Sequence, residues 1–164
     1  MNYQPKNILV TGGAGFIGSH FIRHMLAHDA NLQIINIDAL TYAGSLDNLK
    51  DLPSSRHHFI QEDICNTDYM QALFEEHQID TIVHFAAESH VDRSIMGPGA
   101  FVFTNVVGTF NLLEAARLHW GDHADPKRYR FHYISTDEVF GALTKNEKPF
   151  TENSPYKPNS PYAA

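Results

Sequence analysis

The sequence predicts an α/β fold in which helices cover both faces of a parallel sheet. Along the 164 residues, short apolar stretches alternate with longer stretches of helical periodicity. The apolar stretches, such as "NILVTGG" and "LQIINID", are nearly continuous and do not alternate with polar residues. Strands of that kind are buried on both faces, as in parallel sheets whose connections are helices. We therefore expect one domain with a doubly wound parallel sheet and a substantial core.

Five strands and three helices are expected. The first helix spans Phe16–His28, the second is "TDYMQALFEEH" with Asn66 or Thr67 as its N-cap, and the third covers 101–118. The stretch "KNEKPFTENSPYKPNSPYAA" is rich in Pro, Asn and Ser, which predicts a loop in which Tyr162 starts a new helix. The apolar face of the first helix consists of Ile17, Phe21, Ile22, Met25 and Leu26. The strands are "NILVTGG", "LQIINID", "HHFIQED", "DTIVHFAA" and "RYRFHYIST".

Composition and charge argue against several classes of protein. The formal net charge is −7, which disfavours general binding to nucleic acid or to anionic membranes. No apolar run approaches the roughly 18 residues of a membrane span, and the N-terminus lacks a signal-peptide pattern. The one cysteine, Cys65, excludes an intrachain disulfide and suits a reducing compartment. We expect a cytoplasmic protein.

A glycine-rich turn joins the first strand to the first helix. "LVTGGAGFIGSHF" contains Gly12, Gly15 and Gly18, and its place between a strand and an amphipathic helix is the context that dinucleotide binding requires. The helix N-terminus then offers N–H groups and the positive end of its dipole to a pyrophosphate. Asp38 ends the second strand, 20 residues beyond Gly18, where a carboxylate can accept both ribose hydroxyls. No arginine follows Asp38 to receive a 2′-phosphate, so a Rossmann-like fold with NAD rather than NADP is expected.

Residues after the third and fourth strands are expected along the same edge of the sheet. They are Asp63, Ile64, Phe85, Ala86 and Ala87, and the small alanines would let a dinucleotide lie close to the backbone. Simple core packing is the alternative explanation for the alanines.

"YISTDEVFG" places two carboxylates where a buried strand ends. The run from Ser135 to Glu138 fits a capping box, in which the acidic side chain would serve the helix start. Paired carboxylates can also act as acid and base if mutual repulsion and burial raise one pKa. Tyr162 is a candidate base for an alcohol, with Thr136 as its hydroxyl partner. The lysine that would lower the tyrosine pKa, four residues later, lies beyond the end of the chain.

The motifs "TGGAGFIGS", "DALTYAG", "FAAESHVDRS", "TNVVGTFNLLEAAR", "STDEVFG" and "PNSPYAA" resemble those of the extended short-chain dehydrogenase/reductases. Within that family the whole chain is most similar to nucleotide-sugar 4,6-dehydratases, which implies NAD as cofactor and dTDP-glucose as substrate. Tyr162 and Thr136 then match the groups at the C4 oxygen, Glu138 the base at C5 and Asp137 the acid at C6. Ser89 matches a residue near nicotinamide and substrate, and no metal is implied. Further cofactor contacts are expected from Phe16, Ile17, Leu40, Thr41 and Thr104.

The resemblance also implies features beyond the site. Residues 1–164 would form an incomplete NAD-binding domain, with a C-terminal nucleotide-sugar-binding part absent, and the 101–118 helix would carry a homodimer interface. Phe140 departs from the tyrosine usual in the family. A related epimerase, a dehydratase for another nucleotide-sugar, and a fragment that only binds the dinucleotide remain alternatives.

The histidines of the first helix and Arg93 are further polar residues with more than one explanation. His20, His24 and His28 recur on one helix face, where a solvated surface is favoured over a metal site. Arg93 is either a phosphate contact or a structural ion-pair residue.

Overall fold

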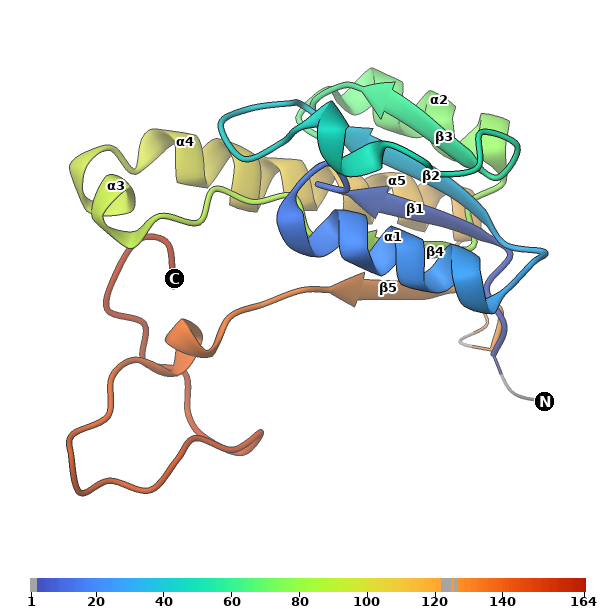
Figure 1. Ribbon diagram of the computed structural model, residues 1–164. Helices are drawn as coiled ribbons and strands as arrows, with labels where there is room; N and C mark the ends of the chain where they lie inside the picture. Colours follow the sequence, from blue (N-terminus) through green and yellow to red (C-terminus); the bar gives the residue numbers. More distant parts are fainter. Residues whose placement is uncertain (1–2, 122–124, 126) are drawn as a thin grey trace.

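A five-stranded parallel sheet forms the centre of the protein in the computed structural model, which describes residues 3–121, 125 and 127–164 (Figure 1). The strand order is β3-β2-β1-β4-β5. In register, Leu9 of β1 pairs with Ile35 of β2 and Ile82 of β4. The order reverses beside β1, and ligands of open α/β sheets bind at such switch points. The strands are β1 Asn7–Thr11, β2 Gln33–Asp38, β3 His57–Gln61, β4 Thr81–His84 and β5 Arg130–Tyr133.

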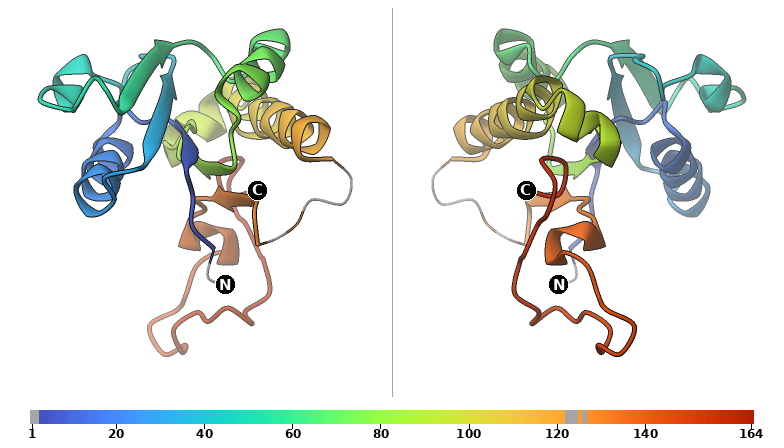
Figure 2. Two further views of the ribbon diagram at one scale, coloured as in Figure 1. Left: turned by 90° about the vertical axis from the view of Figure 1, so that its right-hand side faces the viewer. Right: turned by 90° about the vertical axis from the view of Figure 1, so that its left-hand side faces the viewer.

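Helices cover the two faces of the sheet, which confirms the predicted doubly wound arrangement (Figure 2). On one face α1 (Phe16–His28) packs Ile22 and Leu26 against β1 and β2. On the other face α2 (Thr67–His77) and α5 (Thr109–Trp120) form a core around Phe74 and Leu112. Asn66 caps α2 as predicted, because its side chain accepts a hydrogen bond from the backbone of Tyr69.

The predicted 101–118 helix is a composite. It consists of α4 (Gly99–Phe101), a π-helical segment labelled η2 (Val102–Gly108) and α5, so the prediction of a uniform α-helix was wrong. Within the π segment, the Asn105 side chain donates to the carbonyl of Glu88 and accepts from its N–H, each at 2.9 Å. Single-turn π segments are frequent at functional sites. The apolar side chains exposed along this composite helix are Val102, Phe103, Val106, Val107, Phe110, Leu113 and Leu118.

Three local expectations differ from the structure. Ile17 is 64% exposed and does not belong to the core face of α1. The short helix α3 (Val91–Met96) was not predicted, because six residues give too little periodicity. The capping box from Ser135 to Glu138 is wrong by one residue, since Thr136 caps the 3-10 helix η3 (Asp137–Phe140) by accepting from the Glu138 N–H.

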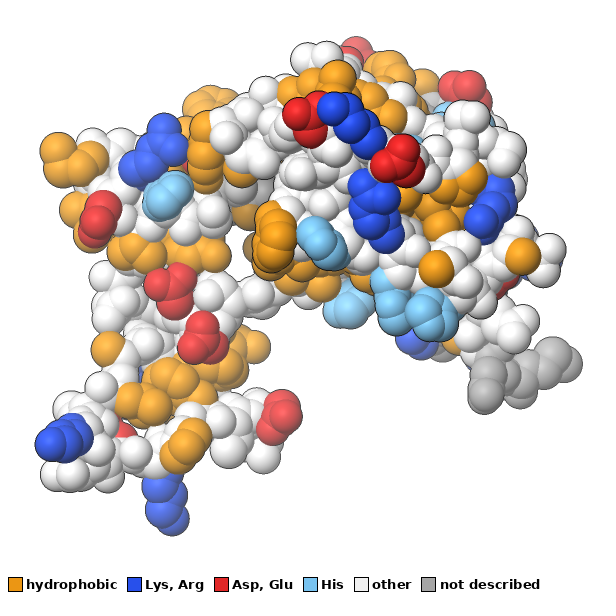
Figure 3. All heavy atoms as spheres, viewed as in Figure 1, with side chains coloured by type: hydrophobic (Ala, Val, Ile, Leu, Met, Phe, Trp, Pro, Cys, Tyr) orange, Lys and Arg blue, Asp and Glu red, His pale blue; other side chains and the backbone are white. Residues whose placement is uncertain are grey.

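The segment after β5 leaves the body of the protein as an extended arm (Figure 1). It turns back on itself where the Lys157 N–H donates to the Val139 carbonyl, and hydrophobic side chains gather on it (Figure 3). Phe140 lies 5.3 Å from the Phe150 ring and 5.4 Å from the Tyr156 ring. Tyr162 lies in a turn and does not begin a helix. A 3-10 helix η1 (Leu46–Leu49) follows β2, and within the described residues no helix could cross a membrane.

Candidate functional site

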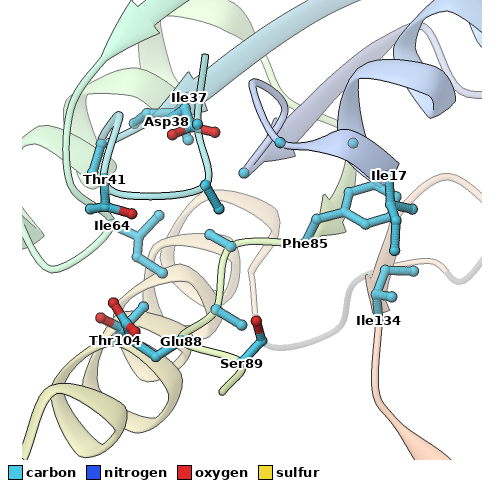
Figure 4. Close-up of a pocket in the computed structure, with 18 of the residues that line it drawn as sticks. Ile17, Ile37, Asp38, Thr41, Ile64, Phe85, Glu88, Ser89, Thr104 and Ile134 are labelled. Carbon is cyan, nitrogen blue, oxygen red and sulfur yellow. The ribbon is translucent and has the colours of Figure 1, made fainter. Parts of the chain in front are cut away.

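A cavity of about 410 Å³ opens at the carboxyl ends of β1, β2 and β4 (Figure 4). Asp38 and Thr41 lie at one end, and Glu88, Ser89 and Thr104 at the other. Its size is within the range of small-molecule sites. The predicted site residues that line it are Gly12, Gly15, Phe16, Ile17, Gly18, Asp38, Thr41, Asp63, Ile64, Phe85, Ala86, Ala87, Ser89, Thr104 and Tyr162.

The glycine turn leaves no room for side chains. Gly12 has φ +70°, and a Cβ there would lie 2.7 Å from the backbone nitrogen of Ala86. A Cβ on Gly18 would lie 2.4 Å from the carbonyl oxygen of Gly12. The turn therefore packs directly against the start of α1, whose first turn carries no acidic residue. Such a bare backbone cradle at a helix N-terminus fits the pyrophosphate of a dinucleotide.

Asp38 is held rigidly at the end of β2. One carboxylate oxygen accepts from the Ala14 N–H at 2.9 Å and the other from the Leu40 N–H at 2.8 Å. Each oxygen keeps a further lone pair for a ribose hydroxyl. Leu40 does not line the cavity, and its backbone, with φ +52°, orients Asp38 instead. Gly44 allows the loop after β2 to lie close to the Asp38 side chain, since a Cβ there would lie 2.7 Å from Asp38 Oδ1.

His84 joins three elements of the fold beside the cavity. Its ring is 1% exposed, with Nδ1 2.6 Å from Thr11 Oγ1 and Nε2 2.9 Å from Thr109 Oγ1. The Thr11 hydroxyl also accepts from the Ala86 N–H at 3.2 Å. Burial lowers the pKa of His84 to about 4. A neutral imidazole thus links the ends of β1 and β4 to the start of α5.

The hydroxyl and carboxyl groups predicted for catalysis lie beside this cavity. Tyr162 lines it and hydrogen-bonds Thr136. Thr136 Oγ1 lies 3.4 Å from Glu138 Oε2, to which it donates. Asp137 is exposed and Glu138 half-buried, and neither lines the cavity. Burial raises the pKa of Tyr162, with the Glu138 charge adding to the effect and the Thr136 hydrogen bond opposing it.

Several lining residues were not among the predicted site residues. Ala43 and Gly44 could have been found from the sequence, because small residues after a strand allow the following loop to lie close to the strand end. Glu62 and Ser135 directly neighbour predicted residues. Among the residues that the structure describes, no group of three or more potential metal ligands occurs. The unpredicted lining residues are Ile37, Ala39, Ala43, Gly44, Glu62, Glu88, Ile134 and Ser135.

The sequence matches a family model over most of its length. The model describes GDP-mannose 4,6 dehydratase and covers residues 9–164. The chain belongs to this dehydratase family. Among curated relatives, the dTDP-glucose 4,6-dehydratase of Neisseria gonorrhoeae is 51% identical over 162 residues, which is 97% of this chain and 46% of the relative. That of Haemophilus influenzae is 51% identical over 161 residues, 96% of this chain and 47% of the relative. The chain thus spans about half the length of these relatives.

Solved structures of family members share the fold. The dTDP-glucose 4,6-dehydratase of Bacillus anthracis, in complex with NAD, has a TM-score of 0.80 and 41% identity, over 96% of this chain and 46% of that one. DesIV, the corresponding enzyme of Streptomyces venezuelae with NAD bound, has a TM-score of 0.84 and 44% identity, over 96% and 47%. A UDP-glucose 4-epimerase of Thermus thermophilus, also with NAD, has a TM-score of 0.80 and 31% identity, over 96% and 46%. The fold is therefore common to dehydratases and epimerases.

Proposed function

We propose that this chain is the NAD-binding part of a dTDP-glucose 4,6-dehydratase. The observation that carries the proposal is one cavity that joins a glycine turn and Asp38 to Tyr162, which hydrogen-bonds Thr136 next to Asp137 and Glu138. Two relatives of that name, each 51% identical to this chain, support it, as do two other enzymes of that name solved with NAD, at 41% and 44% identity.

The cofactor half of the proposal assigns Asp38 to the adenosine ribose and the glycine turn to the pyrophosphate. Phe85, Ala86 and Ala87 would lie along the dinucleotide, and Ser89 and Thr104 near its nicotinamide end. The bound NAD supplies a hydride acceptor at C4 of the sugar and a hydride donor at C6. NAD is preferred over NADP because the Asp38 carboxylate would repel a 2′-phosphate.

The chemical half assigns acid and base roles to the end of β5. Tyr162 takes the proton of the C4 hydroxyl during oxidation, and Thr136 holds the same oxygen. The resulting ketone makes the C5 proton acidic, and the Glu138 carboxylate removes it. Asp137 gives its proton to the C6 hydroxyl, which leaves as water. Glu138 returns its proton to C5 when hydride reaches C6. An epimerase needs no such elimination, so this acid pair favours the dehydratase.

The remaining parts of the proposal concern the whole protein. Nucleotide-sugar specificity would reside in residues beyond this chain. The apolar side chains exposed on the composite helix, with Phe103 65% and Phe110 60% exposed, support a homodimer interface there. Static light scattering tests the dimer. We also propose a cytoplasmic location.

The experiment that tests the function has two arms. Calorimetry with NAD and NADP on this chain should give the tighter binding with NAD, and tighter NADP binding would contradict the assignment of Asp38. In the second arm, dTDP-glucose and NAD are incubated with this chain and with a chain extended through the lysine and the C-terminal half, and the 4-keto product is measured. We expect product with the extended chain alone. Epimerisation of another nucleotide-sugar by an extended chain inactive on dTDP-glucose would favour the epimerase.

A further inference from the structure

The walls of the cavity are acidic. Four carboxylates line it, from Asp38, Glu62, Asp63 and Glu88. None of its described lining residues is Lys, Arg or His. A diphosphate carries about two negative charges, so its approach to these carboxylates is opposed by repulsion. The N-terminus of α1 offers about half a positive charge, which offsets only part of that repulsion.

One arginine lies close to a loop that lines this cavity. Its guanidinium carbon, in Arg93 of α3, lies 4.6 Å from the ring centroid of Tyr42. Tyr42 does not itself line the cavity, but it sits between Thr41 and Ala43, which do, and its phenol contributes slightly to the raised pKa of Tyr162, another lining residue. The His90 ring lies 5.8 Å from the Tyr42 ring on the same side. Tyr42 therefore holds the Arg93 guanidinium beside the loop after β2, which forms part of the cavity wall.

The stacking leaves the Arg93 donors available. In the described part of the chain, the Arg93 side chain makes no hydrogen bond to protein, and the ion pairs there involve other side chains. A guanidinium stacked on a ring uses its flat face, whereas its N–H groups point outward in its own plane. That edge is the part of arginine that binds phosphate oxygens in pairs.

We propose that Arg93, held on Tyr42, is the cation that binds the diphosphate of a nucleotide in this cavity. The proposal rests on the nucleotide-binding function proposed above. The diphosphate belongs either to the dinucleotide or to the nucleotide-sugar, and both present the same chemistry to Arg93. Binding of either then depends on ionic strength through this side chain.

The test compares Arg93→Ala, Arg93→Lys and the unaltered chain by calorimetry at low and high salt. The probes are NAD, ADP, adenosine and dTDP. Arg93→Ala should weaken NAD and ADP about fivefold at low salt, the size expected for one exposed charge pair, and leave adenosine unchanged. Arg93→Lys should recover part of the loss, because it keeps the charge but loses the planar stack. A loss for dTDP alone assigns Arg93 to the nucleotide-sugar diphosphate.

Arg128→Ala is the matched control. Arg128 also lies over a tyrosine, with its guanidinium carbon 5.2 Å from the ring centroid of Tyr129, but no sequence neighbour of this pair lines the cavity. Arg128→Ala should therefore leave the affinities for all four probes unchanged. The proposal is overturned if Arg93→Ala binds NAD and ADP as tightly as the unaltered chain and if dTDP binding also does not depend on Arg93. An equal loss for adenosine also overturns it, since the effect would then be structural. Failure of the unaltered chain to bind NAD would instead refute the proposed function.

Discussion

Acidification should destabilise the fold through His84, and the size of the effect follows from its burial. The ring is enclosed between Thr11 and Thr109, and its pKa falls from 6.5 to about 4. Protonation would make both ring nitrogens donors, so the nitrogen that accepts a hydrogen bond in the neutral ring would lose that bond. The folded chain therefore keeps His84 neutral, whereas the unfolded chain binds a proton near pH 6.5.

The direction and magnitude come from this difference in proton binding. Since the unfolded state binds more protons between about pH 6.5 and pH 4, stability falls as the pH falls through that window. His84 alone should remove about 2 kcal/mol between pH 7 and pH 5, and about 3 kcal/mol once both states are protonated. His57, whose pKa is also lowered by burial, acts in the same direction.

Urea unfolding followed by circular dichroism at several pH values measures the effect. His84→Gln should flatten the pH dependence, whereas His20→Gln, on an exposed ring bonded to the Phe16 carbonyl of its own helix, should not. If the glutamine variant fails to fold, an NMR titration of the unaltered chain gives the His84 pKa directly. A His84 pKa near 6.5 in the folded protein would refute the reasoning.

Three further predictions concern the cavity. Gly18→Ala should lower the melting temperature and abolish measurable NAD binding, because the new Cβ would lie 2.4 Å from the carbonyl oxygen of Gly12. Gly97→Ala should change neither, because no atom lies within 4 Å of a Cβ at that position. Asp38→Ala should weaken NAD by about 1–3 kcal/mol in calorimetry, whereas Asp47→Ala, whose ion pair with Lys50 is exposed, should not; equal affinities would exclude Asp38 from binding. Burial raises the pKa of Cys65 to about 11 from 9.0, so iodoacetamide should alkylate it about 100-fold more slowly at pH 8 in the folded chain than in urea, and equal rates by mass spectrometry would contradict that pKa.

Features set by local spacing could be predicted from the sequence. The glycine turn, Asp38 and the alanines after β4 each follow a strand directly, and parallel strands bring their carboxyl ends to one edge. The three central strands, β1, β2 and β4, are also nearly fully buried, which makes their apolar pattern clear. The two edge strands, β3 and β5, are more exposed, and they were predicted from their place in the alternation of strands and helices.

Features set by contacts between distant residues could not be predicted. Thr11 and His84 are 73 residues apart, and nothing in either local pattern indicates that they share a hydrogen bond. The stack of Arg93 on Tyr42 likewise depends on how α3 lies against the loop after β2. Ile17 shows the limit of periodicity, because a helix that opens a ligand site exposes apolar residues to the cavity as well as to the core.

The surroundings of Tyr162 show why the proposed chemistry depends on more than these residues. Its burial and the charge of Glu138 raise the tyrosine pKa, and of the described groups that act on it only the Thr136 hydrogen bond lowers it. A tyrosine in this environment keeps its proton at neutral pH, so it is a poor base by itself. A positive charge close to the phenol would lower its pKa, and by linkage the ionised phenol would bind that positive charge more tightly. The acidic cavity that opposes a diphosphate would favour a cation at the same time. Base function at Tyr162, as proposed above, therefore requires a positive charge close to the phenol, which the oxidised nicotinamide of a bound NAD would supply.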